Sequence, residues 1–309
     1  MNEILATTRS ESNRTLLMGV LNVTPDSFSD GGIYTGVAEA VDRGVALWDA
    51  GADVVDVGGE STRPGAEPVD AAEELGRVLP VIEGLARARP QGVISIDTTK
   101  AAVAARALDA GARWVNDISG ATFEPELLRV VADRAATLVL GHTRGRPSSM
   151  QDGSWTYRGG VVRAVRQGLR ASATRALDAG VGPSRIWVDP GIGFGKTLDE
   201  NLELLRHLGN LRTLGFPVLV GTSRKRFIGR LTGRAPAERA FGTAATVALS
   251  IQAGAEGVRV HDVEAIHDVI QVSDAWVRGL VPAEPSPAAS EPPPLTPEPV
   301  GPTDGGTDR

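Results

Sequence analysis

The chain has 309 residues, of which 41% are hydrophobic, so it is long enough to bury one large core. Its net charge of -6 offers no basic footprint for nucleic acid, and the absence of cysteine excludes disulfides, thiolate metal sites and a cysteine nucleophile. The sequence contains no run of 18 apolar residues and no signal-like N-terminus, and we therefore expect a cytoplasmic enzyme.

Short β-branched apolar runs alternate with longer helical patterns along the chain. Strands are predicted at residues 16–22, 53–57, 93–97, 114–117, 137–142, 186–189, 217–221 and 258–261. Helices are predicted between them at residues 37–50, 71–88, 101–110, 125–134, 161–179, 198–208, 238–252 and 263–278. Eight strand–helix units predict a parallel sheet that closes into a single (β/α)8 TIM-type barrel.

One catalytic domain is expected over residues 14–280, with an N-terminal extension over residues 1–13. From about Val281 the composition becomes rich in Pro, Glu, Ser and Gly, with few large apolar residues. Such a segment cannot bury enough surface to offset its ordering entropy. Residues 281–309 are therefore predicted to form a disordered tail.

Polar side chains stand at the carboxyl end of nearly every predicted strand, where a (β/α)8 barrel carries its active site. The set is Asn22, Asp56, Asp97, Asn116 with Asp117, His142, Asp189, Thr222 with Ser223, and Arg259 with His261. The carboxylates and amides suit a flat heterocycle with an amino and amide edge. Positive charge at the same mouth suits an anionic group such as a diphosphate, and is expected from Arg63, Lys225, Arg259 and His261.

Several familiar kinds of site are not indicated. No Ser-His-Asp constellation is evident, and the four histidines do not have zinc-site spacing. The segment DPGIGFGK at residues 189–196 follows a strand, but it lacks Walker spacing, so a phosphate-binding loop and an ordinary strand-to-helix turn both stay open. Lys225 is one of only three lysines and stands where a helix is expected to begin, a place that favours a cation only if a ligand faces it.

Seven segments resemble dihydropteroate synthases, in that family's order, over roughly residues 16–278. They are GVLNVTPDSFSDGG (19–32), DVGGESTRPG (56–65), SIDT (95–98), NDISG (116–120), DPGIGFGK (189–196), SRK (223–225) and RVHD (259–262). The resemblance implies condensation of 7,8-dihydropterin-6-ylmethyl diphosphate with p-aminobenzoate, which gives 7,8-dihydropteroate and diphosphate.

The resemblance also implies residue roles. The pterin pocket is expected from Asp97, Asn116, Asp189 and Lys225, and the diphosphate site from Asn22, Arg259 and His261, with Asn22 as the ligand of a Mg2+ cofactor. The surroundings of p-aminobenzoate are expected from Thr62, Arg63, Phe28, Pro64, Phe194 and Ser223. Asp97, Lys225, Thr62 and Arg63 are the expected catalytic residues. The N-terminus of the helix opened by Ser223-Arg224-Lys225 is expected to hold the aminobenzoate carboxylate.

Two positions depart from the family pattern. Gly141 precedes His142 where many members have a methionine against the pterin, so the pocket is either looser or filled by a neighbour such as Val115 or Leu140. Arg226 follows Lys225 where some members have a serine.

Other functions stay open on sequence alone. A methyltetrahydrofolate:corrinoid methyltransferase has a similar barrel, a non-catalytic pterin-binding paralogue would share the pocket, and a Schiff-base aldolase would use Lys225. The expected partners are small-molecule substrates, with neither nucleic acid nor membrane, and a homodimer is left open.

Overall fold

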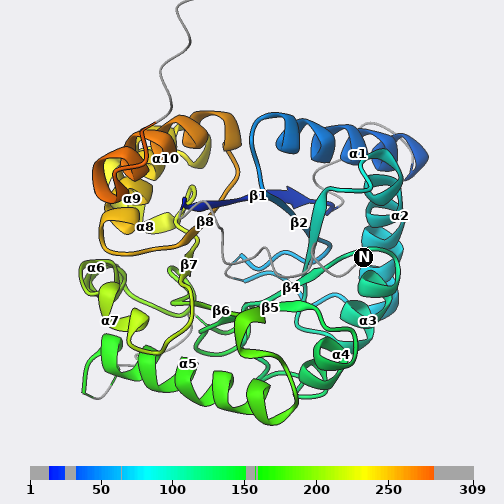
Figure 1. The fold of residues 1–309 in the computed structure, drawn as a ribbon, viewed down its shortest axis with the longest axis horizontal. Coiled ribbons are helices and arrows are strands. Elements are labelled where there is room, and N and C mark those ends of the chain that lie inside the picture. The colour runs from blue at the N-terminus through cyan, green and yellow to red at the C-terminus, as the bar shows by residue number, and fades with distance from the viewer. Residues whose placement is uncertain (1–13, 25–32, 64, 151–156, 158, 282–309) are drawn as a thin grey trace, which may run out of the picture.

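A computed structural model describes residues 14–24, 33–63, 65–150, 157 and 159–281. The expected N-terminal extension and nearly all of the predicted tail, residues 282–309, therefore lie outside the described residues. The described chain forms a ring of helices around parallel strands (Figure 1). The strands are β1 (Leu16–Asn22), β2 (Val54–Gly58), β3 (Val93–Asp97), β4 (Trp114–Asp117), β5 (Thr137–Gly141), β6 (Ile186–Asp189), β7 (Leu219–Val220) and β8 (Gly257–Val260).

The predicted barrel is confirmed, with one weak seam. The strand order is β6-β5-β4-β3-β2-β1-β8-β7, and every neighbouring pair is parallel. Between β6 and β7 the ladder is reduced to an isolated bridge from Val188 to Val218. Strand β7 is accordingly shorter than the predicted 217–221. The ring of strands is closed at this seam by a single bridge, against two or more residue pairs between every other pair of neighbouring strands.

The helices agree with the predicted alternation; α8 is the helix expected to begin at Lys225, and the short α7 was not predicted. Their bounds are α1 (Ile33–Asp49), α2 (Ala71–Ala88), α3 (Ala101–Asp109), α4 (Leu127–Asp133), α5 (Val161–Asp178), α6 (Leu198–Arg206), α7 (Gly209–Arg212), α8 (Arg226–Thr232), α9 (Ala240–Gln252) and α10 (Val263–Arg278). Local sequence sets the starts of two of them. Asp70 caps α2 by accepting the Glu73 N–H at 2.8 Å, and Thr197 and Glu200 form a reciprocal capping box on α6.

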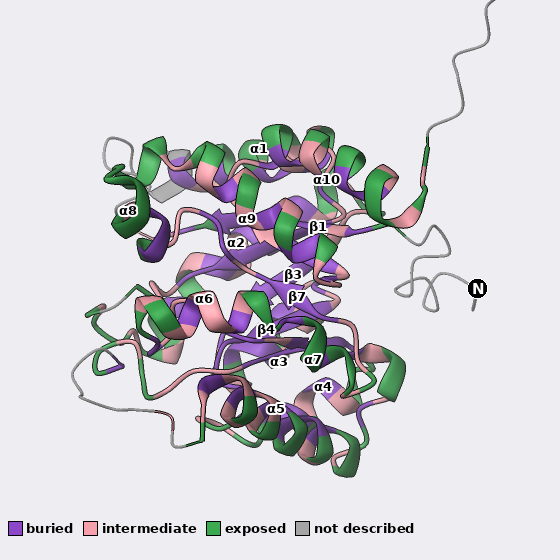
Figure 2. Cartoon of the chain, turned by 90° about the vertical axis from the view of Figure 1, so that its left-hand side faces the viewer, coloured by how far each residue is buried: buried purple, intermediate pink, exposed green. Residues whose placement is uncertain are grey.

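Alternation along the strands separates an apolar floor from a polar mouth. The lower barrel interior is filled by Met18, Val54, Trp114, Val139, Trp187 and Leu219, and the rings of Trp114 and Trp187 lie 5.5 Å apart. Because side chains two residues apart point to the same face, the next inward residues on these strands stand directly above that floor. Figure 2 shows the buried strands at the centre and the exposed residues on the outer helix faces. Within the described ranges, none of the helices combines the length and the apolarity needed to span a bilayer.

Candidate active site

Four polar side chains from four strands meet above the apolar floor. Arg259 donates from Nε to Asp56 Oδ2 at 2.6 Å and from Nη2 to Asp97 Oδ2 at 2.7 Å. Asn116 Nδ2 donates to the same Asp56 Oδ2 at 3.0 Å. Asp56 is fully buried and Asp97 is 8% exposed. The guanidinium thus neutralises two carboxylates that would otherwise repel each other in a site shielded from water.

Strand register explains why these residues share one layer. Asp97 pairs with Gly58 on one side and with Asn116 on the other, so Asp97 and Asn116 are at the same height. Asp56 lies two residues below Gly58 and therefore faces inward as well. Arg259 pairs with Met18 near the floor, and its long side chain reaches upward to both carboxylates.

Burial shifts the pKa of Asp97 into the neutral range. It raises this pKa to about 7, the charge of Arg259 opposes the rise, and the charge of Asp56 adds to it. Burial likewise raises the pKa of Asp189, whose Oδ1 accepts the Gly191 N–H at 2.6 Å. Both carboxylates are costly to ionise without a partner, and both suit a ligand that donates N–H groups.

Lys225 faces the mouth from the loop after β7. Its Nζ lies 4.0 Å from the centroid of the Phe194 ring, and its stem passes Gly193, where a Cβ would come within 3.2 Å of Lys225 Cδ. Burial and the charge of Arg259 lower the pKa of Lys225 and Asp189 and Asp97 oppose the shift, which leaves this pKa at about 8. The ammonium is thus held over an aromatic face among carboxylates that stabilise it only in part.

Ser223 and His261 form a pair on the same side of the barrel. Ser223 Oγ accepts the His261 backbone N–H at 3.1 Å and lies 2.9 Å from His261 Nδ1. Burial lowers the pKa of His261 to about 3, assisted by the charges of Arg259 and Arg224. The expectation that His261 supplies positive charge is therefore wrong for the free protein. A neutral ring whose Nδ1 accepts from Ser223 presents Nε2–H as a donor.

Three polar residues expected at the mouth point away from it. Asp117 accepts the N–H groups of Ser119 and Ala121 and so closes its own loop. A Cβ at Gly168 of α5 would lie 2.8 Å from the His142 ring, so His142 faces that helix, and Thr222 accepts from Thr246 of α9 at 2.9 Å. Each of the three follows an inward-facing position by one residue, so its side chain faces the surrounding helices.

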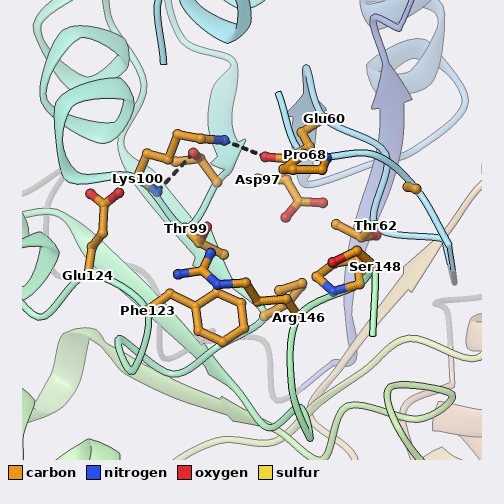
Figure 3. Close-up of a pocket in the computed structure, with 14 residues that line it drawn as sticks. Glu60, Thr62, Pro68, Asp97, Thr99, Lys100, Phe123, Glu124, Arg146 and Ser148 are labelled. Atoms are coloured by element: carbon orange, nitrogen blue, oxygen red, sulfur yellow. Dashed lines mark hydrogen bonds and ion pairs between the residues drawn. The ribbon is translucent and has the colours of Figure 1, made fainter. Parts of the chain in front are cut away.

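A pocket opens beside Asp97 between the loops that follow β2, β3, β4 and β5 (Figure 3). Thr62 lines it together with Thr98, Ile118, Phe123 and Arg146. Arg63 is exposed next to Thr62 on the same loop. Phe28 and Pro64, which are expected near the aminobenzoate, lie outside the described residues.

The two departures from the family pattern have different outcomes. A Cβ at Gly141 would lie 2.6 Å from Ile118 Cα and 2.7 Å from Ile118 O. The backbone of the loop after β4 therefore occupies the space expected for a side chain at this position. The expected filling by a neighbour is thus made by Ile118, and not by Val115 or Leu140, which were named as examples. Arg226 is exposed at the first residue of α8, a helix of seven residues.

Two residues with a central place received no specific role from sequence reasoning, although Asp56 was expected at the mouth. Asp56 joins Asn116 to Arg259, and its position at a strand end was the available signal. Lys196 is 5% exposed and donates from Nζ to the carbonyl oxygens of His142, Gly191 and Phe194, at 2.9, 2.8 and 3.1 Å. It thereby fixes the loop that carries Phe194. The scarcity of lysine was the signal for it.

The donor set at the mouth constrains the metal that it can hold. Within the described ranges, no three His, Asp or Glu side chains are grouped as a metal site. Asn22 ends β1 with an exposed side chain, and a Cβ at Gly58 would lie 3.7 Å from its Oδ1. A single amide oxygen of this kind fits a hard cation that keeps its waters and is held mainly by the phosphate oxygens of a ligand.

Comparison with known proteins agrees with this geometry. A family model described as pterin binding enzyme matches residues 18–261, and the chain belongs to this family. Among curated proteins, it is 50% identical to the dihydropteroate synthase of Synechocystis over 86% of this chain and 91% of that protein. It is 46% identical to the dihydropteroate synthase of Bacillus subtilis over 87% of this chain and 90% of that one.

Solved structures of dihydropteroate synthases superpose over most of the barrel. The enzyme of Clostridium difficile, determined in the presence of pteroic acid, has a TM-score of 0.82 at 41% identity and covers 87% of this chain and 99% of its own. The enzyme of Xanthomonas albilineans in complex with 7,8-dihydropteroate has a TM-score of 0.77 at 42% identity, covering 88% and 96%. At these identities the chain resembles these enzymes in sequence as well as in fold.

Proposed function

We infer that this protein condenses 7,8-dihydropterin-6-ylmethyl diphosphate with p-aminobenzoate to give 7,8-dihydropteroate and diphosphate. It is a transferase of the dihydropteroate synthase kind. The observation that carries this conclusion is the sequence identity to dihydropteroate synthases, which extends over most of the chain. One of these enzymes was solved in complex with 7,8-dihydropteroate. The paired carboxylates and amide at the mouth supply chemistry that suits a pterin.

The pterin is assigned to the polar layer formed by Asp97, Asn116, Asp189 and Lys225. The carboxyl oxygens accept hydrogen bonds from the amino and ring N–H groups of the heterocycle, which gives planar specificity. Lys225 approaches from the loop after β7, and its ammonium suits the carbonyl side of the ring. Asp56 is added to this set because it orients Asn116 and Arg259.

The diphosphate is assigned to Asn22, Arg259 and His261. A neutral His261 would donate from Nε2 to the diphosphate. The positive charge of Arg259, which also pairs with Asp56 and Asp97, would attract the diphosphate as well. Mg2+ bound at Asn22 would neutralise the negative charge that develops on the departing diphosphate. Removing divalent cations with EDTA should lower the measured affinity for pterin diphosphate at least tenfold, and added Mg2+ should restore it. Equal affinity with and without the metal would contradict the assignment.

The aromatic amine is assigned to Thr62, Arg63, Phe194 and Ser223; Phe28 and Pro64, which lie outside the described residues, are kept in this set on the sequence alone. Its nitrogen lone pair is free at neutral pH, so no strong base is needed. The chain contributes orientation of the two substrates and electrostatic stabilisation of the pterin methylene as the carbon–oxygen bond breaks. Asp97 is placed to stabilise that developing positive charge.

One assay tests the function. Purified protein, Mg2+, dihydropterin diphosphate and p-aminobenzoate should yield dihydropteroate and diphosphate, detected by mass spectrometry. Asp97→Asn, nearly isosteric with the wild type, should lower turnover at least tenfold, about 1.4 kcal/mol of barrier. A corrinoid methyltransferase, a regulatory paralogue or an aldolase would form no dihydropteroate in this mixture.

Assembly as a homodimer through α9 and α10 and a cytoplasmic location are part of the proposal. Helix α9 contains no charged residue, Phe241 on it is 91% exposed, and Trp276 on the adjacent α10 is 85% exposed. A second copy of the same apolar face would cover both residues. Light scattering should report a dimer that Trp276→Glu dissociates and Leu177→Glu, on α5, does not. Cell fractionation tests the location.

A further inference from the structure

A cluster of three charged residues lies at the wall of the pocket. Lys100, which directly precedes α3, donates from Nζ to Glu60 Oε2 and to Glu74 Oε2, the latter at 2.5 Å. The side chain of Glu74 is completely buried, and that of Lys100 is 16% exposed. We call Lys100, Glu60 and Glu74 the Lys100 cluster.

Burying the charged groups of the Lys100 cluster costs desolvation free energy. Burial raises the pKa of Glu74, and the hydrogen bond and charge of Lys100 oppose that rise. Buried ion pairs of this kind usually stabilise a fold no better than apolar side chains of similar volume. What the cluster holds in place is therefore a better explanation of it than stability.

Glu60 holds both ends of one loop. It lies two residues beyond β2, immediately before residues 61–68, and its Oε1 accepts the N–H of Val69 at 3.4 Å. Lys100 binds the other carboxylate oxygen and links it to the starts of α2 and α3. Figure 3 shows Lys100 extended toward Glu60, with Thr62 on the far side of Asp97.

In the described part of the loop, two further hydrogen bonds attach its beginning and its middle. Arg77 Nη1 donates to Gly59 O at 2.7 Å at its beginning, and Gly65 N–H donates to Pro147 O at 3.0 Å near its middle. Thr62 and Arg63 lie between these two contacts. Their position therefore depends on the Glu60 carboxylate more than on strand pairing.

We propose that Lys100 acts through Glu60 as a positioning residue for loop 61–68, and that the Lys100 cluster sets affinity for the aromatic amine rather than for the pterin. This inference rests on the proposed function, which assigns Thr62 and Arg63 to the wall around p-aminobenzoate. Asp97 and Asn116, assigned to the pterin, stand on paired strands instead. Loosening the loop should thus affect one substrate and spare the other.

Glu60→Ala is the informative substitution. Replacing Lys100 would leave Glu74 buried without its cation, which endangers folding. Removing the Glu60 carboxylate leaves Lys100 paired with Glu74 and cuts only the link to the loop. Glu60→Gln keeps the shape and retains one of the two hydrogen bonds. Asp109→Ala is the matched control, because it removes the ion pair with Arg134 at the opposite end of α3.

Two measurements follow, one kinetic and one independent of activity. Glu60→Ala should raise KM for p-aminobenzoate at least fivefold and change the Kd for pterin diphosphate by less than twofold. Glu60→Gln should give an intermediate increase, and Asp109→Ala should give none. Hydrogen exchange of peptides covering residues 61–69 should accelerate at least fivefold in Glu60→Ala and stay unchanged in Asp109→Ala.

The outcomes separate this inference from the proposed function. Wild-type protein that forms no dihydropteroate refutes the function, whereas exchange in residues 61–69 still reports whether Glu60 holds the loop. Active wild type with an unchanged KM for p-aminobenzoate in Glu60→Ala refutes the positioning role alone, as does equal weakening of both substrates. If Glu60→Ala does not fold, Glu60→Gln decides by the same criteria.

Discussion

Gly141→Ala is expected to destabilise the protein even though it adds only one methyl group. The new Cβ would lie 2.6 Å from Ile118 Cα and 2.7 Å from Ile118 O, and Cβ atoms essentially never approach other heavy atoms within 3.0 Å. Both atoms belong to backbone, so no side chain can rotate away. Overpacking of this kind costs about 1–3 kcal/mol. Gly141→Met, which restores the family's residue, should cost at least as much.

A second glycine provides a control with the opposite sign. Gly76 lies inside α2, is exposed, and has no atom within 4 Å of its ideal Cβ position. Gly76→Ala should therefore raise the free energy of unfolding by about 0.5–1 kcal/mol, because alanine loses less backbone entropy in a helix. Urea unfolding followed by circular dichroism measures both changes. A Gly141→Ala protein as stable as wild type would refute the close contact with Ile118.

Three further predictions address the mouth and the tail. Lys225→Ala should weaken pterin diphosphate binding at least tenfold by calorimetry, and Lys225→Arg should rescue it poorly, because a planar fork cannot replace a compact ammonium; wild-type affinity in Lys225→Ala would remove this residue from the pocket. The pKa of Asp97 is raised to about 7, so the folded state keeps a proton that the unfolded chain has lost, and the contribution of Asp97 to stability should fall as pH rises from about 4 to 7. The slope of the unfolding free energy against pH should therefore differ between wild type and Asp97→Asn over this window. Equal slopes would contradict the raised pKa. Deleting residues 282–309 should leave turnover and Tm nearly unchanged, because the composition of this segment supplies no core, and a large loss of either would contradict the prediction.

Much of the barrel could be predicted because its signals are local. Strands β1, β3, β4 and β6 and helices α2 and α10 have the predicted bounds, since alternating apolar runs and helix periodicity are visible in short windows. The two-residue period of a strand also separates side chains that face the mouth from those that face the helices. It places Asn116 inward and Asp117 outward, and it would have removed His142 from the set expected at the mouth.

The remaining features depend on contacts between distant segments. Nothing near Gly141 in the sequence shows that the backbone of Ile118 crosses it, and nothing near Lys100 predicts that Glu60 and Glu74 meet its ammonium. The lowered pKa of His261 depends on its burial and on the charges of Arg259 and Arg224, and its partner Ser223 lies 38 residues away in sequence. Such features follow from packing, which local periodicity does not encode.

Because β6 and β7 are weakly paired, a ligand bound across them would help to hold the barrel together. Asp189 and Phe194 belong to β6 and the loop after it, whereas Lys225 follows β7, so the proposed pterin pocket spans the seam that Val188 and Val218 alone bridge within the ladder. A ligand held from both sides acts as a cross-link between two halves that the backbone joins loosely. If the pterin binds where we propose, its binding would add a link between β6 and β7 and would stabilise the folded state against opening at this seam.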